Sequence, residues 1–194
     1  LLTAGTCRSA PSRQQRMPLA RYCGVVGYKP SYGLISRNGV LKTSDKLDTI
    51  GVFGKTVKDV ALLAKTLIKK DLYDPATVHF AADDMIEVCD KGPIFEPKFI
   101  FYKTHNWKNI PKESQKAFEF LIKNLKKNIE VFDTPSYFKE IPKYHQIIHE
   151  TDLANNFQVY YKKDKKKLSK EMRDAIERGM KYSAKEYTDA IDFM

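Results

Sequence analysis

The fold class is decided by residues 99–132, which read FIFYKTHNWKNIPKESQKAFEFLIKNLKKNIEVF. Residues 99–102 are apolar and aromatic, which is typical of a short strand. Residues 113–127 carry apolar side chains at helical spacing, and residues 129–132 alternate as a second strand. A strand, a helix and a strand in that order form a βαβ unit, which indicates parallel pairing and an α/β fold.

Upstream of this unit, residues 22–28 form an apolar run that predicts a buried strand, stopped by Pro30. A loop follows and continues to about Gly54. Residues 56–70 predict an amphipathic helix, because apolar side chains recur on one stripe and Thr56 can cap the first turn, with Asp59 in the capping-box position. Residues 71–97 are expected to be mainly loop.

Downstream, the last third of the chain is expected to be helical. Residues 136–161 predict one or two helices, with Pro142 at a bend or a helix start. The lysine run 162–167 then reads as a linker. Ser169 caps a helix that fades at Gly179, and the capping box formed by Ser183 and Glu186 opens a last helix.

The bulk composition indicates one globular domain with a lysine-rich surface. The chain has 194 residues, 42% of them hydrophobic and 30% charged, and a formal net charge of +10. The lysines are scattered and their densest run lacks interleaved aromatic residues, so we expect a solvated surface and no nucleic-acid partner. No apolar run is long enough to span a membrane. Three cysteines without metal-type spacing favour a reducing compartment, and hence the cytoplasm.

One segment closely resembles a known family. Residues 23–39, CGVVGYKPSYGLISRNG, are similar to the stretch that follows the nucleophilic serine of amidase-signature enzymes. Residues 47–51 and 56–63 also match a loop and a helix of that family, and the resemblance extends over residues 20–194. It implies an amidase-signature fold, a mixed β-sheet flanked by helices, of which this chain is a middle-to-C-terminal slice cut at both ends.

The expected organisation is a single partial domain over residues 1–194. Within it, residues 1–21 are an aberrant segment without apolar periodicity, residues 22–63 are the signature block, and residues 64–194 are the α/β continuation.

The chemistry implied by the resemblance is hydrolysis of a small-molecule carboxamide without a metal or organic cofactor. The family uses a serine nucleophile, a second serine with a cis peptide bond, and a lysine that acts as the base. The lysine and the bridging serine lie upstream of the nucleophile in the family and have no counterpart here. We therefore expect the chain to be inactive by itself.

The nucleophile segment departs from the family pattern. Counting back from Cys23 places the nucleophile at Gln15, whereas counting forward from Gly5 places it at Pro11. Ser12 lies between them and is the candidate catalytic residue, although an ordinary loop serine is the favoured interpretation. The residues on both sides of this segment match the family pattern, whereas those within it do not. This suggests a local frame error in the coding sequence or a junction between two pieces.

Two groups could suggest metal binding. His145 and His149 share a helix face, but Gln146 stands where a zinc hydrolase has its general-base glutamate, so we expect surface histidines flanking buried isoleucines. The acidic residues Asp84 and Glu87, together with Asp83, lack the glycine turn of a cation-binding loop and are expected to be solvated.

Four further residues are interpreted as structural. Trp107 and Tyr102 could line a pocket but are expected to be core aromatics. Arg37 and Asp48 lie in the matched stretch and are expected to order loops through ion pairs.

Two alternatives to a free-standing amidase stay open. The first is the subunit that supplies ammonia in tRNA-dependent amidation, although residues 41–48 look more like free-standing amidases. The second is a non-enzymatic basic binding module. A homo-oligomer is compatible with either reading.

Overall fold

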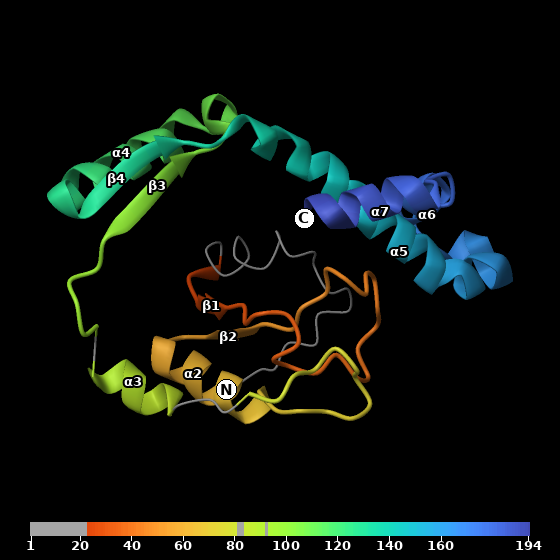
Figure 1. Cartoon of the computed structure of the whole chain (residues 1–194), viewed down its shortest axis with the longest axis horizontal. Coiled ribbons are helices and arrows are strands. Elements are labelled where there is room, and N and C mark those ends of the chain that lie inside the picture. Colours follow the sequence, from red (N-terminus) through yellow and green to blue (C-terminus); the bar gives the residue numbers. More distant parts are fainter. Residues whose placement is uncertain (1–22, 81–83, 92) are drawn as a thin grey trace. The chain divides into compact units, whose positions relative to one another are not determined.

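The computed structural model describes residues 23–80, 84–91 and 93–194, which fall into two compact units. One unit comprises the described part of residues 1–92 together with His145–Met194, and the other is Pro93–Tyr144. Both units combine helices with strands (Figure 1), which confirms the α/β class.

The first unit contains a short antiparallel strand pair covered by a helix. β1 (Val26–Tyr28) pairs with β2 (Val52–Gly54), and α2 (Val57–Leu67) packs on them (Figure 1). The centre of this packing is a buried cluster of Val52, Val60 and Ala64.

Two elements of this unit were not predicted from the sequence. β2 lies in a stretch that was expected to be loop, and it is a strand because its three residues pair with β1, which lies far upstream. α3 (Met85–Lys91) lies in the second expected loop. Asp84 accepts hydrogen bonds from the backbone N–H groups of Ile86 and Glu87, and Met85 packs against the core beside α2.

The start of α2 follows its local sequence signal. The Thr56 hydroxyl accepts from the Asp59 backbone N–H at 3.2 Å, and the Asp59 carboxylate accepts from the Thr56 N–H at 3.0 Å. These reciprocal bonds satisfy two N–H groups that a helix start otherwise leaves without partners. The predicted capping box is confirmed.

Three helices form the C-terminal part of the first unit. α5 (Ile141–Asp164) contains Pro142 in its first turn, so this proline marks the helix start. α6 (Lys170–Gly179) is capped by the Ser169 hydroxyl, and α7 (Ala184–Phe193) opens on the predicted capping box. α5 and α6 share a buried cluster made by the following residues: Leu153, Ala154, Phe157 and Ile176.

The prediction of a linker over residues 162–167 is wrong in its first half. α5 continues to Asp164, and only Lys165–Lys167 leave it, as the short 3-10 helix η4. Lysine is a good helix former, so Lys162 and Lys163 continue the helix.

The second unit is the expected βαβ arrangement. β3 (Phe99–Lys103) and β4 (Ile129–Asp133) pair in parallel, and α4 (Lys112–Leu125) connects them. Short 3-10 helices flank these elements, namely η1 (Trp107–Asn109), η2 (Lys126–Asn128) and η3 (Ser136–Glu140). Phe101 packs on Trp107 and on Phe118 of α4, with ring centroids 5.3 and 5.4 Å apart. Trp107 therefore packs within an aromatic cluster, but it is only half-buried, so the expected core position is met in part.

Within the described residues, no helix has the length and apolar character needed to cross a membrane.

Candidate functional site

The candidate nucleophile Ser12, and the alternatives at Pro11 and Gln15, lie outside the described residues. The described structure begins immediately downstream, with the signature block and the groups that hold it in place. Three hydrogen-bonded clusters order this region.

The first cluster closes the loop between β1 and β2. The Asp48 carboxylate accepts from the Thr43 N–H at 2.8 Å, the Thr43 hydroxyl at 2.7 Å and the Ser44 N–H at 2.9 Å. All three residues are buried. A buried carboxylate needs such donors, because burying an unpartnered charge is costly. Asp48 thus orders the loop as expected, but through hydrogen bonds rather than an ion pair.

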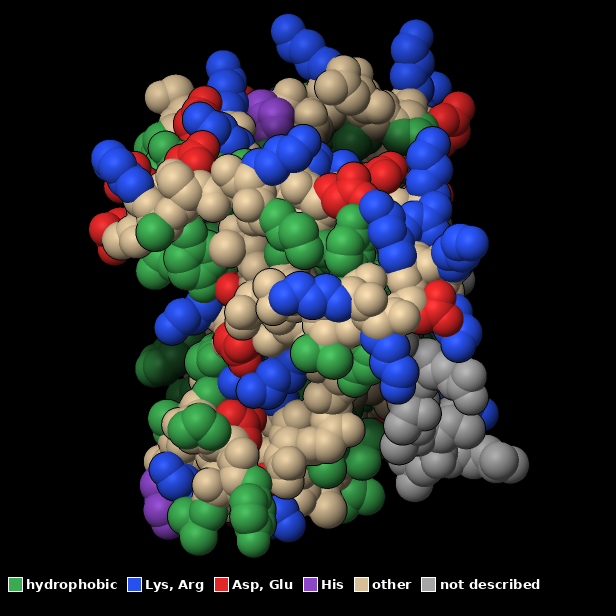
Figure 2. All heavy atoms as spheres, turned by 90° about the vertical axis from the view of Figure 1, so that its right-hand side faces the viewer, with side chains coloured by type: hydrophobic (Ala, Val, Ile, Leu, Met, Phe, Trp, Pro, Cys, Tyr) green, Lys and Arg blue, Asp and Glu red, His purple; other side chains and the backbone are tan. Residues whose placement is uncertain are grey.

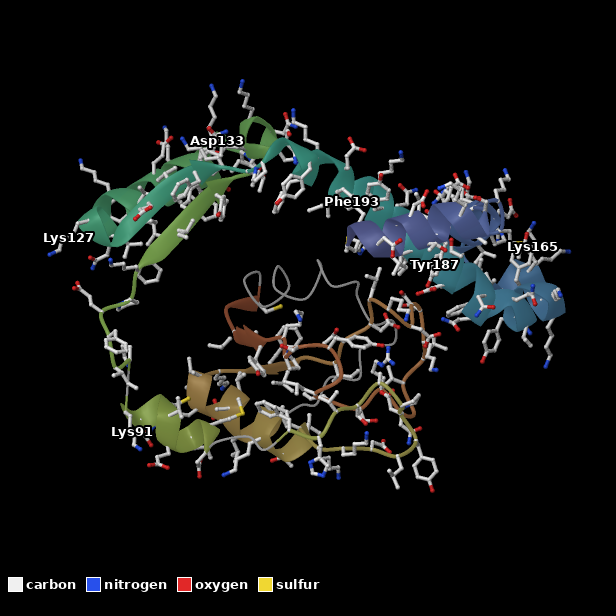
Figure 3. The ribbon with its side chains drawn as sticks, viewed as in Figure 1. Lys91, Lys127, Asp133, Lys165, Tyr187 and Phe193 are labelled. Atoms are coloured by element: carbon white, nitrogen blue, oxygen red, sulfur yellow. The ribbon has the colours of Figure 1, made fainter. Side chains whose placement is uncertain are left out.

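The second cluster joins this loop to the C-terminal helices. Ser44 is fully buried, and its hydroxyl donates to Asp152 Oδ2 of α5 at 2.5 Å. The Tyr187 hydroxyl of α7 donates to Asp152 Oδ1 at 2.8 Å; Figure 3 labels Tyr187. Burial raises the pKa of Tyr187 well above its ordinary value, and the neighbouring Asp152 carboxylate raises it further. The phenol therefore stays protonated and remains a donor.

The third cluster holds the two loops that carry Arg37 and Asp74. The Asp74 carboxylate accepts from the Arg37 guanidinium at 3.3 Å and from the Arg37 backbone N–H at 2.8 Å. Burial by itself would raise the pKa of Asp74, but the hydrogen bonds from Arg37 and Ala76 outweigh it and lower that pKa to about 2. The Tyr32 ring lies 4.9 Å from the Arg37 guanidinium carbon. Arg37 thus orders these loops through an ion pair, as expected, and its partner is Asp74.

Glu150 anchors α6 on α5. Its carboxylate is buried and receives the Arg178 guanidinium in a forked contact of 2.6–3.1 Å. Gln146 donates to the same carboxylate at 3.1 Å. Paired Arg–carboxylate bonds of this kind are strong and directional. Glu150 is therefore committed to this structural contact.

The histidines of α5 flank the buried isoleucines as expected, but they are not exposed surface residues: both are half-buried, and the Nε2 atom of His145 is buried. The rings of His145 and His149 stack in parallel at 6.1 Å, and they flank the buried side chains of Ile147 and Ile148. Across the described part of the chain, no group of three or more His, Cys, Asp or Glu is arranged to hold a metal ion.

The structure also places the acidic residues Asp84 and Glu87 and the aromatic residue Tyr102. Asp84 pairs with Lys65 at 3.0 Å, in addition to capping α3. Glu87 pairs with Lys91, and Asp83 lies outside the described residues. Tyr102 is 51% exposed, so its expected core position is wrong, because it points away from the α4 side of the strand pair.

Sequence reasoning missed the contacts of Asp152. Ser44 and Asp152 are 108 positions apart, and neither belongs to a local motif that pairs a hydroxyl with a carboxylate. Tyr187 is 35 positions from Asp152, and nothing near it in the sequence indicates a partner in α5.

The fold and these clusters define an α/β protein in which the loop between β1 and β2 is hydrogen-bonded to helix α5. Comparison with known families gives a match to the amidase model over residues 16–193. The chain belongs to the amidase-signature family.

Known relatives agree with this assignment. The chain is 30% identical over 176 residues to the A-type subunit of the glutamyl-tRNA(Gln) amidotransferase of Fusobacterium nucleatum, a match that covers 88% of this chain and 32% of that protein. It is 52% identical over 62 residues to the mitochondrial counterpart from Mycosarcoma maydis, covering 32% of this chain and 11% of that one. The chain thus spans about a third, at most, of the length of these relatives.

A solved structure shows the same fold. A crystal structure of an amidase superposes with a TM-score of 0.68 at 22% identity, covering 92% of this chain and 37% of the amidase.

Proposed function

We propose that the chain is part of an enzyme that cleaves the C–N bond of a small-molecule carboxamide with a serine nucleophile. The observation that supports this most is the family match over residues 16–193, which includes the signature block directly downstream of the expected nucleophile segment. The ordered clusters around Asp48, Asp152 and Asp74 support a role for the block as the rigid base of that segment.

In the proposed reaction the serine oxygen attacks the amide carbonyl while its proton passes to a bridging serine and from there to a neutral lysine. The C–N bond breaks, ammonia leaves with the proton returned, and water then hydrolyses the acyl-enzyme to the carboxylate. Backbone N–H groups hold the developing oxyanion. The described residues contribute by positioning, and none of them is assigned to a proton-transfer step.

The test is ammonia release from simple carboxamides by the complete product of the gene that encodes this sequence. We expect release that a serine-directed fluorophosphonate abolishes, with the modified serine upstream of Cys23. The 194-residue chain alone is expected to release none. No release by the complete product, or release that persists after every serine upstream of Cys23 is replaced by alanine, would overturn the proposal.

A second candidate is favoured by the names of the relatives. Both relatives described above are A-type subunits of a glutamyl-tRNA(Gln) amidotransferase. We propose this role as the alternative, in which the amide is glutamine and the ammonia passes to a partner protein. Strong preference for glutamine over simple amides, present only in a complex with other subunits, would favour it over the free-standing amidase.

The same proposal treats residues 1–194 as one partial amidase-signature domain that works in the cytoplasm. The described cysteines, Cys23 and Cys89, are free thiols, which is compatible with a reducing compartment. Whether the enzyme assembles as a homo-oligomer is testable by light scattering on the complete product.

A further inference from the structure

The connection from α5 to α6 carries the densest group of cations in the chain. We name residues 160–173 the basic turn; it contains seven Lys or Arg residues against two acidic ones, Asp164 and Glu171. Figure 2 views the molecule from the side on which this connection lies, and Lys and Arg side chains are interspersed there with acidic and hydrophobic ones. The charge is thus locally concentrated as well as present in the net composition.

Much of this charge has no acidic partner among the described residues. Lys165 pairs with Glu177 at 2.7 Å, and Lys167 pairs with Asp164 at 2.9 Å. Four further lysines of the turn are exposed, and no acidic side chain among the described residues forms an ion pair with them: Lys162, Lys163, Lys166 and Lys170. These four ammonium groups are available to an external anion.

The turn also contains a shallow, open hollow beside several of these cations. Lys165, Lys166 and Arg173 line an open hollow of about 360 Å³. Arg173 is held in place because its Nη1 donates to the Leu168 carbonyl at 2.5 Å. Figure 3 labels Lys165 at this end of the helices. Because Lys165 is already paired with Glu177, the groups that the hollow offers to a phosphate are the positioned Arg173 guanidinium and the Lys166 ammonium.

An exposed aromatic side chain precedes the lysine run near the end of α5. Tyr160 is 53% exposed, and its ring is braced by Phe157 at a centroid distance of 5.7 Å. Tyr161 is occupied differently, because its hydroxyl donates to Glu177 and its ring lies 4.9 Å from the Lys165 ammonium nitrogen. The sequence alone did not separate these two tyrosines. Tyr160 has an open ring on which a base can stack.

We infer that the basic turn binds a single-stranded nucleic acid, with phosphates at the lysines and the hollow and a base on Tyr160. Proteins that bind single strands without sequence preference use cations along the phosphate backbone and aromatic side chains on which bases stack. This inference revises the expectation of a merely solvated lysine surface. It does not depend on the proposed amide chemistry, and it holds for either candidate enzyme.

The experiment uses the full 194-residue chain and a fluorescently labelled oligouridylate, with binding followed by anisotropy over a salt series from about 50 to about 200 mM. The test variant replaces four lysines with glutamine: Lys162→Gln, Lys163→Gln, Lys166→Gln and Lys170→Gln. The matched control makes the same change at four exposed lysines of α4 and η2: Lys112→Gln, Lys116→Gln, Lys123→Gln and Lys127→Gln. Both variants lose the same net charge.

We expect the wild-type chain to bind with a steep salt dependence. The test variant should lower the magnitude of the logarithmic salt slope by about 3, because each phosphate contact in a single strand contributes about 0.7. The control variant should keep most of the affinity. Tyr160→Leu should weaken binding about tenfold without changing the slope. An oligodeoxyuridylate arm tells whether RNA or DNA is preferred, and preferential binding of either supports the inference.

Three outcomes would overturn it. One is no binding of either oligonucleotide at the lowest salt. Another is an equal loss of affinity in the test and control variants, which would assign binding to net charge alone. The third is tighter binding to vesicles of anionic phospholipid than to either oligonucleotide.

Discussion

A very close approach between the backbones of α5 and α6 occurs at Gly179, and it gives a sharp prediction of stability. A Cβ at this position would lie against the carbonyl oxygen of Glu150, 2.5 Å from its carbonyl carbon and 3.0 Å from the Ala154 Cβ. The blocking atoms belong mainly to the α5 backbone, so no side-chain rotation can relieve the contact. The variant Gly179→Ala must therefore push α6 away from α5.

The magnitude follows from what that displacement uncovers. Overpacking a tight contact costs about 1–3 kcal/mol. Partial exposure of Ile176, which is fully buried, and of its neighbours Leu153 and Phe157 adds about 1–2 kcal/mol. The better helix propensity of alanine returns at most about 1 kcal/mol. We expect Gly179→Ala to lower the free energy of unfolding by about 3 kcal/mol.

The assay is urea denaturation of the 194-residue chain followed by far-UV circular dichroism, with the slope of the transition checked for constancy. Gly39→Ala is the matched control, since a Cβ there meets nothing within 4 Å and the cost is that of a φ of +77° alone, about 1 kcal/mol. If Gly179→Ala unfolds at the same urea concentration as wild type, the described packing of α6 on α5 is wrong.

Two predictions concern ionisation. The pKa of Asp74 lies at about 2 instead of 3.8. At about 1.4 kcal/mol per pH unit, this shift corresponds to about 2 kcal/mol in the free energy of unfolding. That contribution is present above about pH 4 and is lost as the pH falls through about 2. Urea denaturation across this acid range should show that loss in the wild type but not in Asp74→Asn; identical profiles would contradict the Arg37–Asp74 contact. The raised pKa of Tyr187 means that its contribution is present below its ordinary value of about 10 and is lost as the pH rises further. In a spectrophotometric titration, Tyr187→Phe should remove the phenol that ionises at the highest pH. The control Tyr73→Phe, at a side chain that is 83% exposed, should leave that high-pH ionisation in place. Loss of the high-pH ionisation in the control alone would count against the Asp152 contact.

The parts of the fold that the sequence predicts are those whose signals are local. The capping boxes at Thr56 and Ser183 depend on residues three positions apart, and each element of the β3–α4–β4 unit has its own local periodicity, although the paired strands are 30 positions apart. β2 escaped prediction because three residues carry no periodicity and become a strand only through their partner.

In the candidate site too, contacts between residues near in sequence could be predicted, whereas contacts between distant residues could not. The role of Asp48 could be anticipated because its partners Thr43 and Ser44 are near in sequence. The pairing of Arg37 with Asp74 could not, since 37 positions separate them and nothing local selects that carboxylate over Asp48. Long-range contacts of buried polar groups are settled by packing, which a single sequence does not display.

The loop between β1 and β2 rests on the C-terminal helices through the hydrogen bond between Ser44 and Asp152. A double-mutant cycle of Ser44→Ala and Asp152→Ala, read by urea denaturation, tests it directly. We predict a coupling free energy of about 1.5–3 kcal/mol, the range for a hydrogen bond to a carboxylate. The control cycle pairs Ser36→Ala with Asp152→Ala and should be additive, because Ser36 bonds to Asp71 instead. A Ser44–Asp152 coupling below about 0.5 kcal/mol, no larger than that of the control cycle, would contradict the account.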